Sequence, residues 1–237
     1  EGLQEFDQLK RFIIGEKRDN WLFLDELRDN ASKELEMADT TKDDMAFLPY
    51  TSGTTGNPKG VVHTHSWGYA HIRTVAKNWL DIQDGDKVWA TAAPGWQKWV
   101  WSPFLATLGS GATAFVYNGK FDPQVYLNFL QNEGIDVLCC TPTEYRFMSQ
   151  QENLAEFDLS NLRNALSAGE ALNLEVIEIF QRNFNINVRD GYGQTENTLL
   201  LGIMKDDDLR PGSMGKPTPG NVVEIIDEDG NVLPAGE

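Results

Sequence analysis

The sequence lacks any long hydrophobic run. No stretch of about 18 consecutive apolar residues occurs among its 237 residues, so no membrane-spanning segment is predicted. The first residues, from Glu1 to Glu5, have neither an initiating methionine nor a basic leader followed by an apolar stretch, so there is no direct sign of export. We therefore expect the natural start of the protein to lie outside this chain.

Basic residues are also scarce. Twenty Lys and Arg face 36 Asp and Glu, which gives a formal net charge of −16. A nucleic-acid binder needs a basic face that displaces counterions from phosphates, so nucleic acid is excluded as a partner. An anionic small molecule would have to be held by local donors, such as backbone dipoles and one or two lysines.

Cysteine and histidine are too few for a disulfide framework or a zinc site. Cys139 and Cys140 are neighbours in an apolar run and would point to opposite faces of a strand, so we expect buried, reduced thiols in a cytoplasmic protein. His63 and His65 would share one face of a strand, with His71 nearby in sequence. No further His or Cys completes a tetrahedral set, which argues against zinc.

One stretch, Tyr50–Gly60, combines three glycines, four Ser or Thr hydroxyls and one lysine. Glycine lets backbone N–H groups approach an anion closely, hydroxyls donate to phosphate oxygens, and lysine adds a mobile positive charge. The spacing is not that of a Walker A loop, because Gly53 and Gly56 enclose only two residues. Predicted strands at 45–50 and 60–64 flank this stretch, so we interpret it as a phosphate-holding loop at the tip of a hairpin; a flexible turn joining two strands is the alternative.

From residue 87 onward, short apolar runs alternate with helical patterns. This alternation predicts an α/β fold with a mostly parallel sheet flanked by helices. The expected strands are 87–93, 112–117, 136–140, 162–167 and 187–190, and the expected helices are 98–108, 123–133, 142–150 and 174–184. Ligands of such sheets lie beyond the carboxyl ends of the strands, which directs attention to the turns after Ala93, Cys140, Ser167 and Asp190.

Three regions are expected along the chain. Residues 1–44 form part of a preceding subdomain, with a strand at 11–14 and a helix at 21–35. Residues 45–203 form the α/β subdomain. Residues 204–237 begin a β subdomain with a hairpin, because a stretch rich in Pro and Gly precedes two short apolar runs separated by an Asp-Gly turn.

A second polar constellation, Asp190–Glu196, follows the last predicted strand of the sheet. It contains two glycines, the aromatic ring of Tyr192, the hydroxyl of Thr195 and the carboxylates of Asp190 and Glu196. A planar ring can stack on a planar base, a hydroxyl can donate to phosphate, and a hard cation prefers carboxylate oxygen. Taken alone, the stretch would favour a polar loop at a sheet edge.

Together, Tyr50–Gly60 and Asp190–Glu196 resemble the signature motifs of the adenylate-forming superfamily, which includes acyl-CoA synthetases, aryl-CoA ligases, luciferases and peptide-synthetase adenylation domains. The resemblance implies that the first loop contacts the β- and γ-phosphates of ATP. The residues that it assigns to these contacts are Thr51, Ser52, Gly53, Thr54, Thr55, Gly56 and Lys59.

The same resemblance implies roles for the second motif. Tyr192 would stack on adenine, Thr195 would donate to the α-phosphate, and Glu196 would coordinate Mg²⁺; Lys59, Thr195 and Glu196 are the expected catalytic residues. Residues 167–172 resemble the family's adenine-side loop, although Ala171 stands where acyl-CoA synthetases commonly carry proline, which should alter the stiffness of the loop. The nucleotide contacts expected in addition are Gly169, Glu170, Asp190, Gly191, Gly193 and Gln194.

Residues 94–101 resemble the aromatic motif that borders the acyl pocket in acyl-CoA synthetases. Trp96 is the pocket candidate, whereas core packing is the expected role of Trp99 and Trp101. Acetyl-specific members of the family place a tryptophan at or next to the position of Gly193, which closes the acyl pocket. A glycine at this position would leave room in the pocket for a larger acid. The chain thereby resembles medium-chain acyl-CoA synthetases, with aryl-CoA ligases as the alternative.

The resemblance implies a two-step reaction. A carboxylic acid attacks the α-phosphate of Mg·ATP, pyrophosphate leaves, and the acyl group then passes from AMP to the thiol of coenzyme A. We expect the chain to be a central fragment that is inactive by itself, since the family's ribose-binding aspartate and its carboxyl-terminal domain with the catalytic lysine are not found in it. An adenylation domain that loads a carrier protein and a non-catalytic nucleotide-binding domain are the alternatives.

Overall fold

The structure is a computed structural model that describes residues 9–52, 56–93, 96–234 and 236. Contacts divide the chain into two units, Glu1–Thr40 and Thr41–Glu237. In the first unit, β1 (Phe12–Ile13) pairs in parallel with β2 (Leu22–Phe23), and α1 (Leu24–Asp29) follows. The strand predicted at 11–14 is confirmed, but the helix predicted at 21–35 is too long. It ends at Asp29, where the Asn30 side chain caps the Glu26 carbonyl, and none of its residues is buried.

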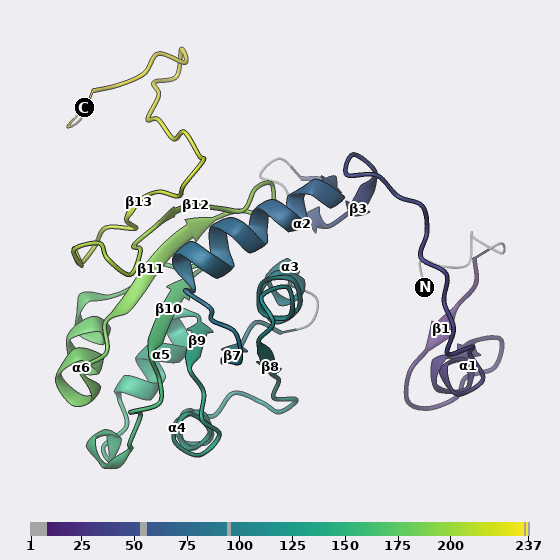
Figure 1. Cartoon of the computed structure of the whole chain (residues 1–237), viewed down its shortest axis with the longest axis horizontal. Coiled ribbons are helices and arrows are strands. Elements are labelled where there is room, and N and C mark those ends of the chain that lie inside the picture. Colours follow the sequence, from purple (N-terminus) through teal and green to yellow (C-terminus); the bar gives the residue numbers. More distant parts are fainter. Residues whose placement is uncertain (1–8, 53–55, 94–95, 235, 237) are drawn as a thin grey trace. The chain divides into compact units, whose positions relative to one another are not determined.

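The second unit is built on a seven-stranded sheet (Figure 1). Its order is β13-β12-β11-β10-β9-β7-β8; the pairs from β11 to β8 are parallel, and β12 and β13 are antiparallel. The strands are β7 (Lys87–Ala90), β8 (Thr113–Phe115), β9 (Val137–Cys140), β10 (Asn164–Ala168), β11 (Val188–Gly193), β12 (Leu199–Gly202) and β13 (Lys216–Pro217). The predicted α/β class with a mostly parallel sheet is confirmed.

Helices cover both faces of this sheet. One face packs against α4 (Pro123–Asn132), α5 (Pro142–Ser149) and α6 (Leu174–Phe184). The other packs against the π-helical segments η1 (Ile72–Trp79) and η2 (Val100–Leu108), which continue α2 (His65–His71) and α3 (Gln97–Trp99). A short 3₁₀ turn, η3 (Leu154–Glu156), follows α5. Pro103 lies inside η2, where it removes a backbone donor and so favours the wider turn.

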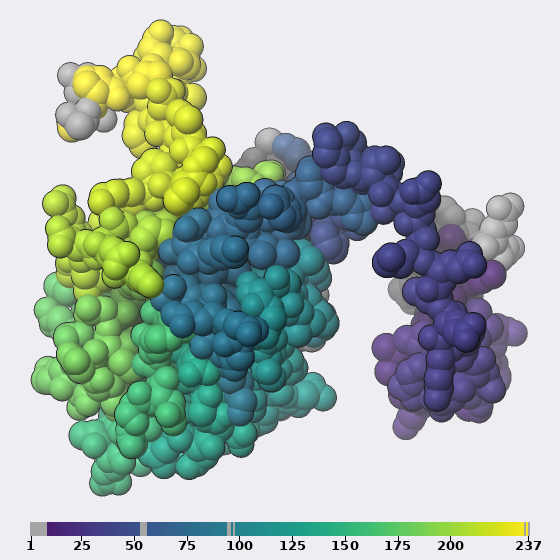
Figure 2. Space-filling model, viewed as in Figure 1, coloured from purple at the N-terminus to yellow at the C-terminus, as the bar shows by residue number. Residues whose placement is uncertain are grey.

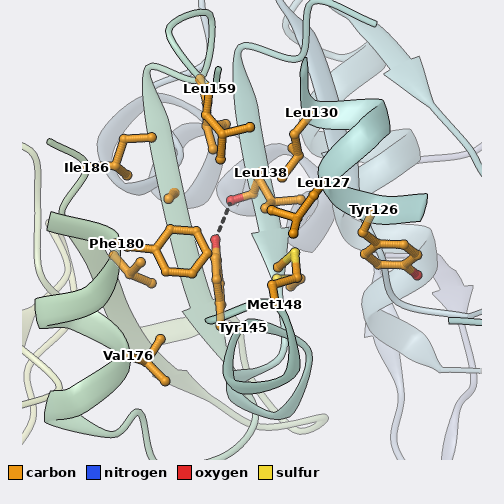
Figure 3. Packing of buried hydrophobic residues seen from close by; sticks show 14 of the residues in the cluster. Tyr126, Leu127, Leu130, Leu138, Tyr145, Met148, Leu159, Val176, Phe180 and Ile186 are labelled. Atoms are coloured by element: carbon orange, nitrogen blue, oxygen red, sulfur yellow. Dashed lines mark hydrogen bonds between the residues drawn. The ribbon is translucent and has the colours of Figure 1, made fainter. Parts of the chain in front are cut away.

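Strand residues alternate between the two cores, as a period of two requires. Cys140 packs in the core beneath α4, α5 and α6, and Cys139 in the core beneath η1 and η2, so their predicted opposite orientation is confirmed. In the first core, the buried Tyr145 hydroxyl donates to the carbonyl of Leu138 on β9 (Figure 3) and to that of Leu166 on β10. Side chains from α5 therefore tie two adjacent strands together.

The long helix formed by α2 and η1 was not predicted. Its sequence contains Gly68 and β-branched residues, which have low helix propensity, yet Val75, Ala76 and Trp79 are buried against the sheet. Packing of this apolar stripe, rather than propensity, stabilises the helix. Its outer side chains lie on the surface of the unit (Figure 2).

The region from 204 onward is less regular than predicted. β13 joins the edge of the main sheet, and the expected hairpin is reduced to a single antiparallel bridge between Ile226 and Val232 around a turn at Asp227. A domain boundary near residue 204 remains a prediction. Among the described residues, no helix has the length and hydrophobicity that crossing a bilayer demands.

Candidate functional site

The Gly-rich stretch lies on an antiparallel hairpin, as predicted. β3 (Met45–Phe47) pairs with β6 (His63–Thr64), and β4 (Tyr50–Thr51) pairs with β5 (Lys59–Gly60) nearer the tip. Thr51 is half-buried, whereas Ser52, Gly56 and Lys59 are exposed. Gly56 has φ +111°, a conformation that favours glycine. Gly53, Thr54 and Thr55 lie outside the described residues.

The turns after three parallel strands are linked by side chains. After β9, Thr141 and Glu144 form a capping box at the start of α5. Thr91, which follows β7, donates to Oε2 of Glu144 at 2.7 Å. Thr143 donates to Oε2 of Glu170, which follows β10, at 2.6 Å. The carboxyl end of the sheet is therefore a connected polar surface, where the fold rule expects a ligand.

β11 carries the second motif into this surface. Asp190 is buried, and its Oδ1 accepts from the Gly191 N–H at 2.8 Å. Burial raises the pKa of this carboxyl, while hydrogen bonds from the backbone of Gly191 and Leu172 and the charge of Lys98 oppose the shift. A Cβ at Gly191 would lie 2.7 Å from the Trp79 ring, so only glycine fits there.

The residues after β11 form a tight turn. The backbone N–H of Gln194 donates to Oδ1 of Asn197 at 2.9 Å, and the N–H of Asn197 donates to the carbonyl of Gln194. Within this turn Thr195 is half-buried and Glu196 is exposed. Tyr192, half-buried, and Gly193, exposed, end β11 just before it.

The hairpin and this turn meet through one hydrogen bond between residues 132 positions apart. Nε2 of His63 lies 2.6 Å from the carbonyl oxygen of Thr195. His63 follows Lys59 by four residues along the hairpin, a span of at most about 14 Å even in fully extended chain. The structure thus brings the base of the Gly-rich hairpin to the turn that bears Thr195 and Glu196.

The side chains of the three residues expected to be catalytic are free to bind a ligand. Within the part of the chain that the structure describes, neither Nζ of Lys59, nor Oγ1 of Thr195, nor the carboxylate of Glu196 makes a hydrogen bond or ion pair. Their backbones are nevertheless held in place by β5 and by the Gln194–Asn197 turn. A hydroxyl, an ammonium and a carboxylate on ordered backbone suit a phosphate ligand with a divalent cation.

The donor set for Mg²⁺ is small. No three His, Cys, Asp or Glu side chains gather as a metal site among the described residues. Mg²⁺ keeps several waters and binds through one or two carboxylates together with substrate phosphates. An exposed single carboxylate at Glu196 fits this mode, in which phosphate oxygens complete the ligand set.

The aromatic residues after β7 separate into two groups. Trp96 is 62% exposed. Trp99, half-buried, packs edge-on against the exposed Phe104, and Trp101, also half-buried, packs against the rings of His63, Trp67 and His71; neither belongs to the two buried cores, so the core packing expected for them stays a prediction. The role of Trp96 in an acyl pocket stays a prediction.

The expected orientation of the histidines is wrong. His63 and His65 do not share a strand face, because β6 ends at Thr64 and His65 begins α2; His63 is buried and His65 is exposed. The buried His71 was left without a role by the sequence. Its Nδ1 lies 2.7 Å from Oγ1 of Thr198, at the far end of the Thr195 turn. The spacing of four residues between Trp67, His71 and Val75 could have indicated a helix with these side chains on one face.

Comparison with known proteins defines the class. The family described as AMP-binding enzyme matches residues 3–237, so the chain belongs to this family, and its predicted membership of the adenylate-forming superfamily is confirmed. It is 62% identical, over 98% of its length and 44% of the relative's, to an uncharacterized acyl-CoA ligase, YtcI, of Bacillus subtilis (strain 168). It is 36% identical to the mitochondrial acyl-coenzyme A synthetase ACSM3 of Rattus norvegicus, over 96% of this chain and 39% of that one.

Solved structures show the same fold. The anthranilate CoA ligase AuaEII, in complex with anthranoyl-AMP, superposes with a TM-score of 0.90 at 27% identity, covering 98% of this chain and 45% of that chain. ATP-bound MatB from Rhodopseudomonas palustris superposes with a TM-score of 0.81 at 26% identity, covering 90% and 42%. The chain therefore spans less than half the length of these relatives.

Proposed function

We propose that the full-length protein bearing this chain is an AMP-forming acid–CoA ligase. In this reaction a carboxylic acid and ATP give an acyl-AMP and pyrophosphate, and coenzyme A then takes the acyl group as a thioester. The observation that carries the proposal is the contact between His63 and Thr195, which brings the Gly-rich hairpin to the turn bearing Glu196. The names of the acyl-CoA ligase relatives agree with this chemistry.

The chain's own residues would act by orientation and by neutralising charge. Lys59 and the hydroxyls of Thr51 and Ser52 would hold the departing pyrophosphate. Thr195 would donate its free hydroxyl to the α-phosphate, and Glu196 would hold Mg²⁺ against the phosphates. Mg²⁺ supplies charge neutralisation on the phosphate oxygens when bound.

Replacement of Glu196 tests this assignment in the full-length protein. Glu196→Ala should lower acid-dependent ATP–pyrophosphate exchange and raise the Mg²⁺ concentration needed for half-maximal rate. Glu178→Ala, another exposed glutamate on the same unit, is the matched control and should leave both unchanged. Unchanged exchange in Glu196→Ala would refute the role of Glu196, and the absence of acid-dependent exchange in the wild type would favour a non-catalytic nucleotide-binding domain.

For the substrate, we propose a medium-chain fatty acid. The support is the absence of a side chain at Gly193 and the exposure of Trp96 in the aromatic segment. Gly193 also has a packing reason, since a Cβ there would lie 2.5 Å from the Thr198 carbonyl. A screen of AMP formation with straight-chain acids from acetate to palmitate, together with benzoate and anthranilate, should peak at intermediate chain length; a peak at the aromatic acids would establish the aryl-CoA alternative.

The acceptor and the competence of the isolated chain are tested separately. Coenzyme A should accept the acyl group, whereas transfer only to a phosphopantetheinylated protein would identify a carrier-loading adenylation domain.

We also propose that the protein acts in the cytoplasm, where the buried thiols stay reduced. We further propose that the 237 residues alone are inactive, because their relatives are more than twice as long. Pyrophosphate exchange by the 237-residue chain at the full-length rate would refute the claim of inactivity.

A further inference from the structure

A column of rings stands behind the Thr195 turn. His63, Trp67 and His71 follow one another at intervals of four residues, with ring centroids 4.6 Å apart for the first pair and 4.9 Å for the second. Trp101, on η2, contacts all three rings. Rings packed in this way cannot rotate freely, so the imidazole nitrogens have fixed directions.

Those nitrogens reach both ends of one short turn. His63 contacts the Thr195 carbonyl at 2.6 Å, and His71 contacts the Thr198 hydroxyl at 2.7 Å. A carbonyl oxygen only accepts, so His63 must carry its proton on Nε2 and donate it. With the hydrogen bonds between Gln194 and Asn197, the turn is then held from within and from two points behind it.

Packing alone does not account for imidazole in this column. Nε2 of His71 and the indole nitrogens of Trp67 and Trp101 are buried without a hydrogen-bond partner among the described residues. Buried, unpartnered polar atoms cost free energy that apolar rings of the same size would avoid. The two imidazoles are explained by their bonded nitrogens, Nε2 of His63 and Nδ1 of His71, which hold Thr195 and Thr198.

Given the function proposed above, we propose that His63 and His71 are positioning residues for acid activation: they fix the turn so that the Thr195 hydroxyl and the Glu196 carboxylate face the phosphates. His63 also joins this turn to β6, at the base of the Gly-rich hairpin. Neither histidine touches a reacting atom. Misplacement of such a turn by about 1 Å would lower the rate by about 10²-fold.

A matched pair of variants at position 63 tests donation against packing in the full-length protein. His63→Gln can still donate to the Thr195 carbonyl, whereas His63→Met has a similar shape and cannot. We expect His63→Met to lower kcat for ATP–pyrophosphate exchange by about 10- to 100-fold with the KM for the acid changed by less than about twofold, and His63→Gln to stay within about fivefold of wild type. His65→Met, at the exposed start of α2, is the control and should behave as wild type.

Two readouts are independent of turnover. Nitrogen-15 NMR of labelled histidine should find a proton on Nε2 of His63, and the dissociation constant for Mg·ATP, measured by calorimetry, should rise more in His63→Met than in His63→Gln. The proposal would be overturned if kcat fell equally in His63→Met and His63→Gln, or if Nε2 of His63 carried no proton. If the wild type activates no acid at all, the proposed function fails, while the NMR and calorimetry still decide the role of His63.

Discussion

His71 gives a stability prediction with a definite sign. Burial, followed by the nearby His63, lowers the pKa of this imidazole from its ordinary value of 6.5 to about 3. The unfolded chain therefore binds a proton at His71 well before the folded chain does, and folding becomes less favourable as pH falls below about 6.5. The loss continues until the pH reaches about 3.

The size follows from the two pKa values. Linkage gives a loss of about 2 kcal/mol at pH 5 and less than about 0.1 kcal/mol at pH 7.5 from this one residue, with a limiting slope of about 1.4 kcal/mol per pH unit. Carboxylates titrate in the same range, so the wild type alone does not isolate the effect. A variant without the imidazole does.

His71→Phe removes the titrating group and keeps a ring in the column. Urea unfolding at pH 7.5 and at pH 5, followed by tryptophan fluorescence, should show that the variant gains about 2 kcal/mol relative to wild type between the two conditions. The exposed His65→Phe is the control for loss of an imidazole from the same helix. A difference between wild type and His71→Phe that is the same at both pH values would refute the assignment of a buried, neutral His71.

Three further outcomes are expected. Gly191→Ala should destabilise the fold by about 1–3 kcal/mol in thermal or urea unfolding, because its Cβ would meet the Trp79 ring at 2.7 Å; unchanged stability would show that Trp79 moves aside at no cost. Thr141→Ala should cost about 1 kcal/mol by loss of the capping box of α5, and Thr141→Ser should restore most of it. Cys139 and Cys140 should resist a thiol reagent in the native protein and react on unfolding, since both are buried and burial raises the pKa of the Cys140 thiol; rapid native labelling would contradict their placement.

Local chemistry was sufficient to predict several parts of the fold. The alternating pattern of short apolar runs predicted β7 to β11 and the helices between them. Strands that are buried on both faces are recognisable because they consist of nearly continuous runs of hydrophobic residues. The apolar runs on either side of the Gly-rich stretch predicted a hairpin, and the pairing of β4 with β5 confirms it.

Other elements escaped prediction because tertiary contacts decide them. The helix over His65–Trp79 has weak propensity and is stabilised by burial of Trp79, whose indole N–H donates to the Asp190 carbonyl at 3.3 Å. The helix expected over 21–35 has good periodicity but buries nothing, and it ends at Asp29. Amphipathic spacing predicts a helix only where a second surface covers its apolar side.

The sequence by itself identified the groups that we propose act on the ligand, Lys59, Thr195 and Glu196, each from the residues next to it. Only the tertiary structure decided that the two segments meet, and that a buried His63 joins them across 132 residues. The physical reason is that a side chain's chemistry is local, whereas the donor that satisfies a buried carbonyl can come from any part of the chain that packing brings within hydrogen-bonding distance.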